Sequence, residues 1–441
     1  MSDSHLCSPR YVSKISVMLA FSLLLSHYEV FADTYSKATN NTVLTLNQAI
    51  DSALAGNPGL AEVKARAQAM AAIPSQAGSL PDPTVSFELL NLPTQNFDLR
   101  KEDMTMMGAG VSQAFPFPGK LALREKIAEH EALAAVDSID EARLLLVREV
   151  KASWWRLYYY NHAMILLADA ERFFEQLIDI AQTQYKVGKG TQQDVLLAQM
   201  ELSNLKNEKY ELISLNHSQT ARINALLDRA PETSVQIPEH IDFKLPNITE
   251  SDLQNRAAQL RPLFAQHRKM QEAARANVDL AKKDFYPDFT VSVGYAVRQN
   301  TPTGQYRSDF ASVQLSMTVP IYADRKQAKA VDQRQSELLQ EHYSLEDEHH
   351  KIQADIASKA AEYQHAKEKL ALLENEMIPQ AQQTVNSLLA GYQVSQSRFS
   401  DLIRTELTYF QYQNQYWQTL TNTQQLLAEL SAAVGEDLNH D

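Results

Sequence analysis

His342, Glu346 and His350 are spaced four residues apart, so a helix would place all three on one face. Imidazole nitrogens and a carboxylate arranged in this way can bind a transition metal. The surrounding segment EHYSLEDEHH (341–350) is also typical of a charged helix face in contact with water. We favour the second interpretation, so the sequence predicts no metal site, and these three residues are the candidates if one exists.

Other chemically capable residues form no recognisable set. Met104, Met106 and Met107 are soft enough to bind Cu(I), but they lie where a loop meets an expected strand. The segment VGKGT (187–191) lacks the Ser or Thr that follows Lys in a phosphate-binding loop. The aromatic run around Trp154 and Trp155 falls inside an expected helix, where packing is its expected role. We therefore predict that the protein is not an enzyme and uses no cofactor.

Composition and the N-terminus indicate export. The chain has 441 residues and a net charge of −13, which argues against a nucleic-acid partner. Residues 1–32 are predicted to be a secretory signal peptide, because basic residues precede the apolar run ISVMLAFSLLL (15–25) and VFA (30–32) resembles a cleavage site. The only cysteine, Cys7, precedes the apolar run, so we expect no lipid anchor.

Long-range repetition organises the rest of the chain. YKVGKGTQQDV begins at Tyr185 and YQVSQSRFSDL begins at Tyr392, an offset of 207 residues (392 − 185). Three earlier pairs of segments match in the same order at offsets of 204 to 206: NPGL with RPLF, LPDPTVSFEL with YPDFTVSVGY, and FPFPGK with VPIYADRK. We interpret this as an internal duplication, in which each copy reads helix, strand, strand, long helix, turn, helix.

The expected strands have two different faces. Phe289, Val291, Val293, Tyr295 and Val297 alternate with small or polar residues, and the segments around 85–89, 109–111 and 313–319 do the same. Their lengths approach the ~9–11 residues with which a tilted strand crosses a bilayer. Soluble hairpins are the alternative, but the Gly, Ala and Ser of the second face offer little for a soluble core.

Two very long helices are expected. No proline occurs between Lys120 and Val187, and a second stretch runs from Asp324 to about Gly391, with a kink or break expected at Pro379. In the returning helix after residue 191, residues three or four positions apart should form one face that packs on another helix, and some of them are polar. These residues are Ala198, Leu202, Leu205, Lys209, Leu212, Asn216, Gln219, Ile223 and Leu226. Helices of this kind are expected to pair antiparallel, with seams that also meet water.

Four strands cannot close a membrane barrel, whose smallest examples have about eight strands. Open edges are not tolerated in lipid, so we expect a homotrimer with a shared twelve-stranded β-barrel. The chain resembles the TolC-like outer-membrane efflux channels through LTLNQAIDSALAGNPGL (44–60), the Pro-Asp strand openings and the two Tyr-x-Val…Asp turns. The expected fold class is mainly α with a membrane β-barrel: an internally duplicated chain with a long-helix α-barrel and four strands per protomer.

The resemblance implies a periplasmic mouth formed by both helical turns. The tips that would dock a periplasmic adaptor protein are Val187, Gly188, Gly190, Val394, Ser395 and Ser397. The residues implied at the gate or constriction are Asp194, Tyr392, Arg398, Asp401 and Arg404. Arg404 stands where the best-known member has a second acid, so a double acidic ring is in question. Arg404 is also spaced to pair with Asp401.

The resemblance also implies a division into regions. The signal peptide is 1–32, the equatorial region is 33–57, 230–260 and 435–441, the periplasmic α-barrel is 58–81, 115–229, 261–286 and 321–434, and the outer-membrane strands are 82–114 and 287–320. The implied location is the outer membrane of a Gram-negative bacterium, in contact with lipid, with the helices in the periplasm.

The implied function is a passive exit channel of a tripartite efflux pump, energised by an inner-membrane transporter of the RND type. LPDPTVSFELLNLP and MTMMGAGVSQAFPFPGKLALRE resemble the heavy-metal branch, which handles copper or cobalt, zinc and cadmium. The alternatives are drug or small-molecule efflux, a type I secretion channel of the same family, and a coiled-coil envelope spacer that transports nothing.

Overall fold

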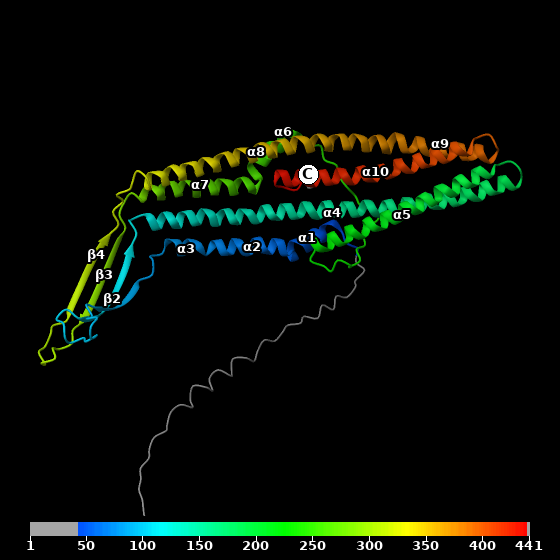
Figure 1. Cartoon of the computed structure of the whole chain (residues 1–441). Coiled ribbons are helices and arrows are strands. Elements are labelled where there is room, and N and C mark those ends of the chain that lie inside the picture. Colours follow the sequence, from blue (N-terminus) through cyan, green and yellow to red (C-terminus); the bar gives the residue numbers. More distant parts are fainter. Residues whose placement is uncertain (1–42, 439–441) are drawn as a thin grey trace, which may run out of the picture. The chain divides into compact units, whose positions relative to one another are not determined.

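The computed structural model describes residues 43–438. Within them the chain consists of long helices and a four-stranded sheet (Figure 1). The expected signal peptide (1–32), Cys7 and parts of the segments 33–57 and 435–441 lie outside the described residues. Between residues 43 and 438 no helix is both long and apolar enough to cross a membrane.

The order of elements repeats, which confirms the duplicated pattern expected from the sequence. The first copy contains α1 (Leu46–Gly56), α2 (Pro58–Ala71), α3 (Ile73–Gly78), β1 (Thr84–Leu90), β2 (Met106–Phe115), α4 (Lys120–Lys186) and α5 (Gln192–Leu226). The second contains α6 (Glu250–Leu260), α7 (Pro262–Lys283), β3 (Phe289–Val297), β4 (Phe310–Met317), α8 (Gln327–Leu372), the π-helix η1 (Leu373–Met377), α9 (Ile378–Gln393) and α10 (Phe399–Val434).

Local sequence signals set the helix starts. The hydroxyl of Thr45 accepts from the amide of Gln48, and the Gln48 side chain accepts from the amide of Thr45, which forms a capping box for α1. Pro58 and Pro262 occupy the first helical position of α2 and α7, where the missing amide hydrogen costs nothing.

The long helices follow the prediction with two differences. α4 has 67 residues, a length of ~100 Å at 1.5 Å per residue. The second long helix begins at Gln327 instead of Asp324, because residues 321–326 form turns, in which the amide of Lys326 donates to the carbonyl of Tyr322 (2.9 Å). Pro379 is the second residue of α9, which begins directly after η1, so the expected break near this proline takes the form of a π-helical turn.

Polar residues at the α4–α5 seam bond to partners on the facing helix. Lys209 pairs with Glu171 (2.7 Å), and the Asn216 amide donates to Asn161 (3.1 Å). The amide of Gln219, which is buried, donates to the hydroxyl of Ser153 (2.6 Å). These contacts satisfy groups that would otherwise be costly to bury, and they specify how α5 aligns with α4.

The packed core near the middle of α4 is aromatic. Trp154, Trp155 and Tyr158 are buried there against α1, as the sequence predicted. The indole nitrogen of Trp154 donates to the carbonyl of Leu44 (3.0 Å), which joins the start of the described chain to α4. Nearby, Val43 forms a parallel bridge with Gln236.

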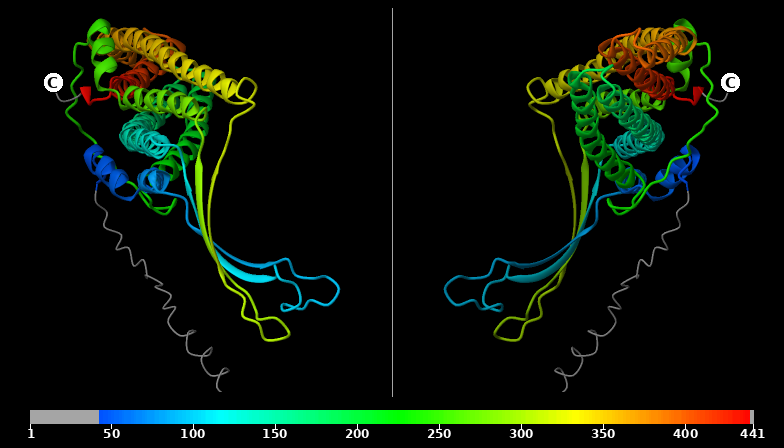
Figure 2. Two further views of the ribbon diagram at one scale, coloured as in Figure 1. Left: turned by 90° about the vertical axis from the view of Figure 1, so that its left-hand side faces the viewer. Right: turned by 90° about the vertical axis from the view of Figure 1, so that its right-hand side faces the viewer.

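The sheet has the order β1-β2-β3-β4, and every pair is antiparallel. Figure 2 shows the strands side by side, extending away from the helices. They contain 7, 10, 9 and 8 residues, so β1 and β4 are shorter than expected. Val319 lies beyond the end of β4, because the strand stops at Met317.

The two faces of the sheet differ as predicted. Val85, Val111, Val293 and Val313 are directly paired across the four strands, and these side chains are 50–77% exposed. On the opposite face the next row is Ser86, Gly110, Gly294 and Ser312. An apolar face left open to this extent in one chain marks a surface that contacts lipid or another protein.

Candidate functional site at the helical tips

The two helical tips have the same backbone structure. In the first, the amides of Lys189 and Gly190 both donate to the carbonyl of Gln184 (2.9 and 3.0 Å). In the second, the amides of Gln396 and Ser397 both donate to the carbonyl of Gly391 (2.8 and 3.3 Å). Each donor and acceptor of the second set lies 207 residues after its counterpart (396 − 189; 391 − 184), so the repeat extends to individual hydrogen bonds.

Both tips require a left-handed residue at the same place. Gly188 has φ 75° and Ser395, at the matching position, has φ 62°. Glycine adopts this conformation without a steric penalty, whereas serine adopts it at a steric cost. The preceding residues, Val187 and Val394, are 61% and 63% exposed. Each tip therefore presents an apolar side chain beside a tight turn.

Tyr392 connects the two tips. It is 6% exposed, and its hydroxyl donates to a carboxylate oxygen of Asp194 at 3.5 Å. Its ring lies 4.8 Å from that of Phe399. Burial, followed by the charge of Asp194 and the hydrogen bond to it, raises the pKa of Tyr392 to about 12. The hydroxyl is therefore protonated at neutral pH and available as a donor. A second link between the tips is a hydrogen bond from the side-chain amide of Gln184 to the backbone carbonyl of Gln393 (3.3 Å).

Asp194 also starts the returning helix of its own tip. Its carboxylate accepts from the amide of Thr191 (3.2 Å), and its amide donates to the hydroxyl of Thr191 (3.3 Å). This is a capping box at the N-terminus of α5. One carboxylate thus caps a helix and accepts from the neighbouring hairpin.

The other predicted gate residues are placed differently. Asp401 lies in the first turn of α10 and is half-buried, and Arg398 precedes that helix without a side-chain cap. Arg404 is exposed one turn further on. Within residues 43–438 no ion pair joins Arg404 to Asp401, although their spacing would allow one. The structure therefore brings Tyr392 and Asp194 together, whereas Asp401 forms no ion pair with Arg404 among the described residues.

The candidate metal ligands do not converge. His342, Glu346 and His350 are all exposed on α8, and no group of three or more His, Cys, Asp or Glu side chains in the described part of the chain is arranged to hold a metal. A ring nitrogen of His342 lies 3.4 Å from the amide of Gln271. Met104 lies in the loop before β2, whereas Met107 pairs with Leu89 and Val297 within the sheet.

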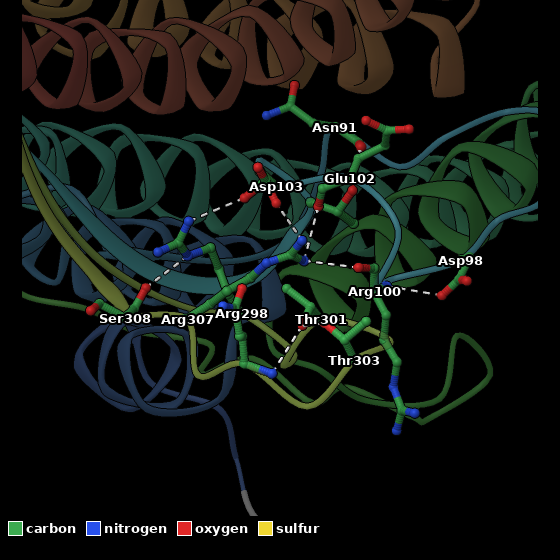
Figure 3. A network of polar contacts seen from close by, with 12 residues as sticks. Asn91, Asp98, Arg100, Glu102, Asp103, Arg298, Thr301, Thr303, Arg307 and Ser308 are labelled. Atoms are coloured by element: carbon green, nitrogen blue, oxygen red, sulfur yellow. Dashed lines mark hydrogen bonds and ion pairs between the residues drawn. The ribbon is translucent and has the colours of Figure 1, made fainter.

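A second polar cluster, which the sequence analysis missed, joins the two loops at the far end of the sheet (Figure 3). The guanidinium of Arg307, which is buried, donates to the carbonyls of Arg100 (2.9 Å) and Glu102 (3.2 Å) and forms an ion pair with Asp103. Arg298 donates to the carbonyl of Asp103 (3.1 Å). The sequence does show basic residues in one loop and acidic residues in the other. It does not show which of them meet, because contacts between loops follow no periodic pattern along the chain.

Comparisons with known proteins agree with this architecture. The family model for "Outer membrane efflux protein" matches residues 49–228 and 253–436, one segment in each copy. The cobalt-zinc-cadmium resistance protein CzcC of Cupriavidus metallidurans is 22% identical over 398 residues, covering 89% of this chain and 90% of the relative.

Two solved structures have the same fold. The outer membrane protein VceC of Vibrio cholerae is similar with a TM-score of 0.75 at 18% identity, covering 89% of this chain and 96% of that one. CusC is similar with a TM-score of 0.74 at 16% identity, covering 89% and 92%. Two duplicated hairpins, a two-faced sheet and a family match along most of the chain lead to one conclusion: this chain belongs to the outer membrane efflux protein family.

Proposed function

We propose that this protein is the trimeric outer-membrane exit channel of a tripartite efflux pump, a passive conduit for heavy-metal ions. The observation that carries the proposal is the sheet, with its exposed row of valines and its two free edges, at β1 and β4. Free strand edges are costly in lipid and invite pairing with another chain. Three copies would supply twelve strands, enough to close a barrel that faces lipid with its valines.

The helices would then form the periplasmic part of the channel, and the tips would form its mouth. The exposed valines Val187 and Val394, with the turns 188–190 and 395–397, are suited to dock a periplasmic adaptor protein. Energy would come from an inner-membrane transporter of the RND type, since a water-filled duct performs no work. The regions expected from the sequence remain the proposed division, with the N-terminus of the exported chain not lipidated.

The proposed substrate class rests on the relative CzcC, whose name refers to cobalt, zinc and cadmium resistance. Drug efflux and protein secretion by the same type of duct are the competing functions. The pump is expected to select the substrate, because a wide aqueous tube has few specific contacts. The exposed histidines His342 and His350 are accordingly assigned no role in metal binding.

Deletion of the gene and complementation test this function. The deletion strain should become sensitive to cobalt, zinc, cadmium, copper or silver, and the wild-type gene should restore tolerance. His342→Ala with His350→Ala should restore it equally. New sensitivity to dyes or antibiotics with unchanged metal tolerance would reassign the channel to drug efflux. A soluble periplasmic rod, in place of a trimer in outer-membrane fractions, would favour the spacer.

A further inference from the structure

A cavity lies at the helical end of the sheet, where β4 leads into α8 (Figure 1). Its volume is about 420 Å³, within the ~300–1,000 Å³ of pockets that hold small ligands. Its walls come from the start of α4, the end of α7, the residues before β3, the segment 318–322 after β4, and the first turn of α8. The cavity is therefore at the opposite end of the long helices from the tips.

One part of the cavity wall is apolar and continues the apolar face of β4. Leu315 and Met317 follow each other at a two-residue step on that face, and they are 69% and 61% exposed. The amide of Thr318 donates to the carbonyl of Asp288 (3.0 Å), so the pairing with the β3 side continues one residue past β4. Val319, which lines the cavity, is the next residue of the apolar row and is 63% exposed. The apolar row therefore runs from the strand into the cavity.

Other residues that line the cavity carry charges of both signs. Lys326 is exposed at the start of α8, and its side chain forms no ion pair or hydrogen bond among residues 43–438. Asp284 pairs with the buried Lys120 (2.9 Å), but 49% of the Asp284 side chain is exposed. Although Lys326 and Asp284 line the same cavity, no ion pair joins them within the described chain. A ligand that carries an anion and a cation a few bonds apart matches this arrangement.

An unsatisfied acceptor indicates the same kind of ligand. The side-chain oxygen Oε1 of Gln327, which also lines the cavity, is buried and has no hydrogen-bond partner in the part of the chain that the structure describes. Leaving a buried acceptor unpaired costs ~1–3 kcal/mol, so such groups normally have a partner. An ammonium group in the cavity would supply the missing donor. The first turn of α8, in which Gln327 lies, also favours an anion beside Lys326.

We propose that this cavity binds the headgroup of a glycerophospholipid, and that phosphoethanolamine is the headgroup that fits it. The phosphate contacts Lys326, and the ammonium group contacts Asp284 and the free oxygen of Gln327. The acyl chains lie along Val319 and the apolar face of β4. The inference rests on the proposed function, because a sheet that crosses the outer membrane, with its helices in the periplasm, places the cavity at the inner, phospholipid leaflet.

Native mass spectrometry of the purified trimer tests the proposal. The trimer is first freed of lipid by detergent exchange, and dioleoyl phosphatidylethanolamine or dioleoyl phosphatidylglycerol is then added at equal concentration. We expect phosphatidylethanolamine to be retained up to one molecule per protomer, at several-fold higher occupancy than phosphatidylglycerol, because the second lipid has no ammonium group. Equal retention of the two lipids would overturn the assignment of phosphoethanolamine.

Two substitutions separate the two charges of the headgroup. Lys326→Ala should weaken the binding of both lipids about tenfold, because both carry the phosphate. Asp284→Asn should weaken phosphatidylethanolamine binding by a similar factor and leave phosphatidylglycerol binding unchanged. Lys120 keeps its ion pair with Asp288 (3.0 Å) in that variant, so the local fold should survive.

Lys329→Ala is the matched control. Lys329 lies three residues beyond Lys326 on the same helix, pairs with Asp332 (2.7 Å) and does not line the cavity. This variant should bind both lipids as the wild type does. An equal loss of binding in Lys329→Ala and Lys326→Ala would overturn the specific role of Lys326.

Two further probes locate the lipid and separate it from free phosphate. Phosphatidylethanolamine with a photoreactive acyl chain should label the segment 317–330, whereas labelling of the strands alone would mean annular lipid only and would overturn the site. Inorganic phosphate should compete only weakly, because it lacks the acyl chains and the ammonium group. Full competition by inorganic phosphate would reduce the cavity to an anion site and overturn the lipid assignment.

The failure of this inference is distinguishable from the failure of the proposed function. A trimer in outer-membrane fractions, with wild-type metal tolerance and with lipid binding unaffected by Lys326→Ala and Asp284→Asn, would overturn the lipid site alone. A soluble monomer that binds neither lipid would overturn both.

Discussion

The hydroxyl of Tyr392 lies 3.5 Å from a carboxylate oxygen of Asp194, and this contact joins the second helical hairpin to the first at their tips. The two residues are separated by 198 positions. Tyr185, the repeat counterpart of Tyr392, is exposed and has no such contact within the described chain. One tyrosine of the repeated pair has therefore become a tie between hairpins.

Removing this tie should open the channel at rest. Tyr392→Phe deletes only the hydroxyl, and hydrogen bonds to charged groups contribute ~1.5–3 kcal/mol. We expect higher resting conductance in planar bilayers, and a further rise when Arg398→Ser is added. Tyr185→Phe is the matched control and should leave conductance unchanged. A Tyr392→Phe, Arg398→Ser channel that stays as closed as the wild type, with trimer intact, would eliminate this gate.

The two matched aspartates should respond differently to neutralisation. Asp194→Asn alters the capping box of α5, so we expect a stability loss of ~1 kcal/mol by thermal unfolding. The Asp401 carboxylate has no hydrogen bond in the described structure, so Asp401→Asn should change stability by less than ~0.5 kcal/mol. If Asp401 lines the mouth, its neutralisation should lower cation selectivity in bilayer recordings. Unchanged selectivity would leave Asp401 with no role beyond favouring the start of α10.

The left-handed residue at each tip gives a reciprocal prediction. Ser395→Gly should stabilise the second tip by ~1 kcal/mol, because a side chain in this conformation costs roughly 1–2 kcal/mol. Gly188→Ser should destabilise the first tip by a similar amount, and backbone strain is the cause because an added Cβ meets nothing within 4 Å. Hydrogen exchange of the tip amides measures both. Equal exchange in all three proteins would contradict the argument.

Glu406 should make stability depend on pH. It is 6% exposed on α10, in line with the buried residues Leu402 and Phe410, and burial raises its pKa to about 7 from 4.5. The folded state therefore favours the protonated acid, so its contribution is complete below pH ~4.5 and is lost as pH rises through 7. Glu406→Gln should remove up to ~3 kcal/mol of this dependence and stabilise the protein at pH 8. Glu376→Gln, at an exposed position, is the control.

Arg307 should hold the two loops of the sheet together. Arg307→Ala removes its bonds to two carbonyls and the ion pair with Asp103 (Figure 3), so loop 91–105 should be cleaved at least ~10-fold faster by protease. Lys101→Ala is the matched control, because Lys101 is an exposed cation of the same loop whose side chain makes no hydrogen bond or ion pair within the described residues. Equal cleavage of both variants would show that the loops are held by other contacts.

The helices, the strands and their repetition can be read from local patterns in the sequence. Long helices are visible as a lack of proline and glycine from Lys120 to Val187, and strands as alternation, because both are local periodicities. The helix starts at Pro58 and Pro262 are local in the same way, since a proline at the first helical position is a local preference. The two tips matched because a 207-residue repeat carries the same turn residues in both copies.

The contacts between residues of different copies become visible only in the folded chain. Three such contacts join residues more than 160 positions apart. They are the hydrogen bond from Tyr392 to Asp194, the ion pair of Arg307 with Asp103, and the ion pair of Lys120 with Asp288. The burial of Glu406 likewise depends on neighbouring helices. Such contacts depend on the register and rotation of packed elements, and a single side chain carries no periodic signal of either. The same reason explains why β1 and β4 are recognised as open edges only once the strand order is known.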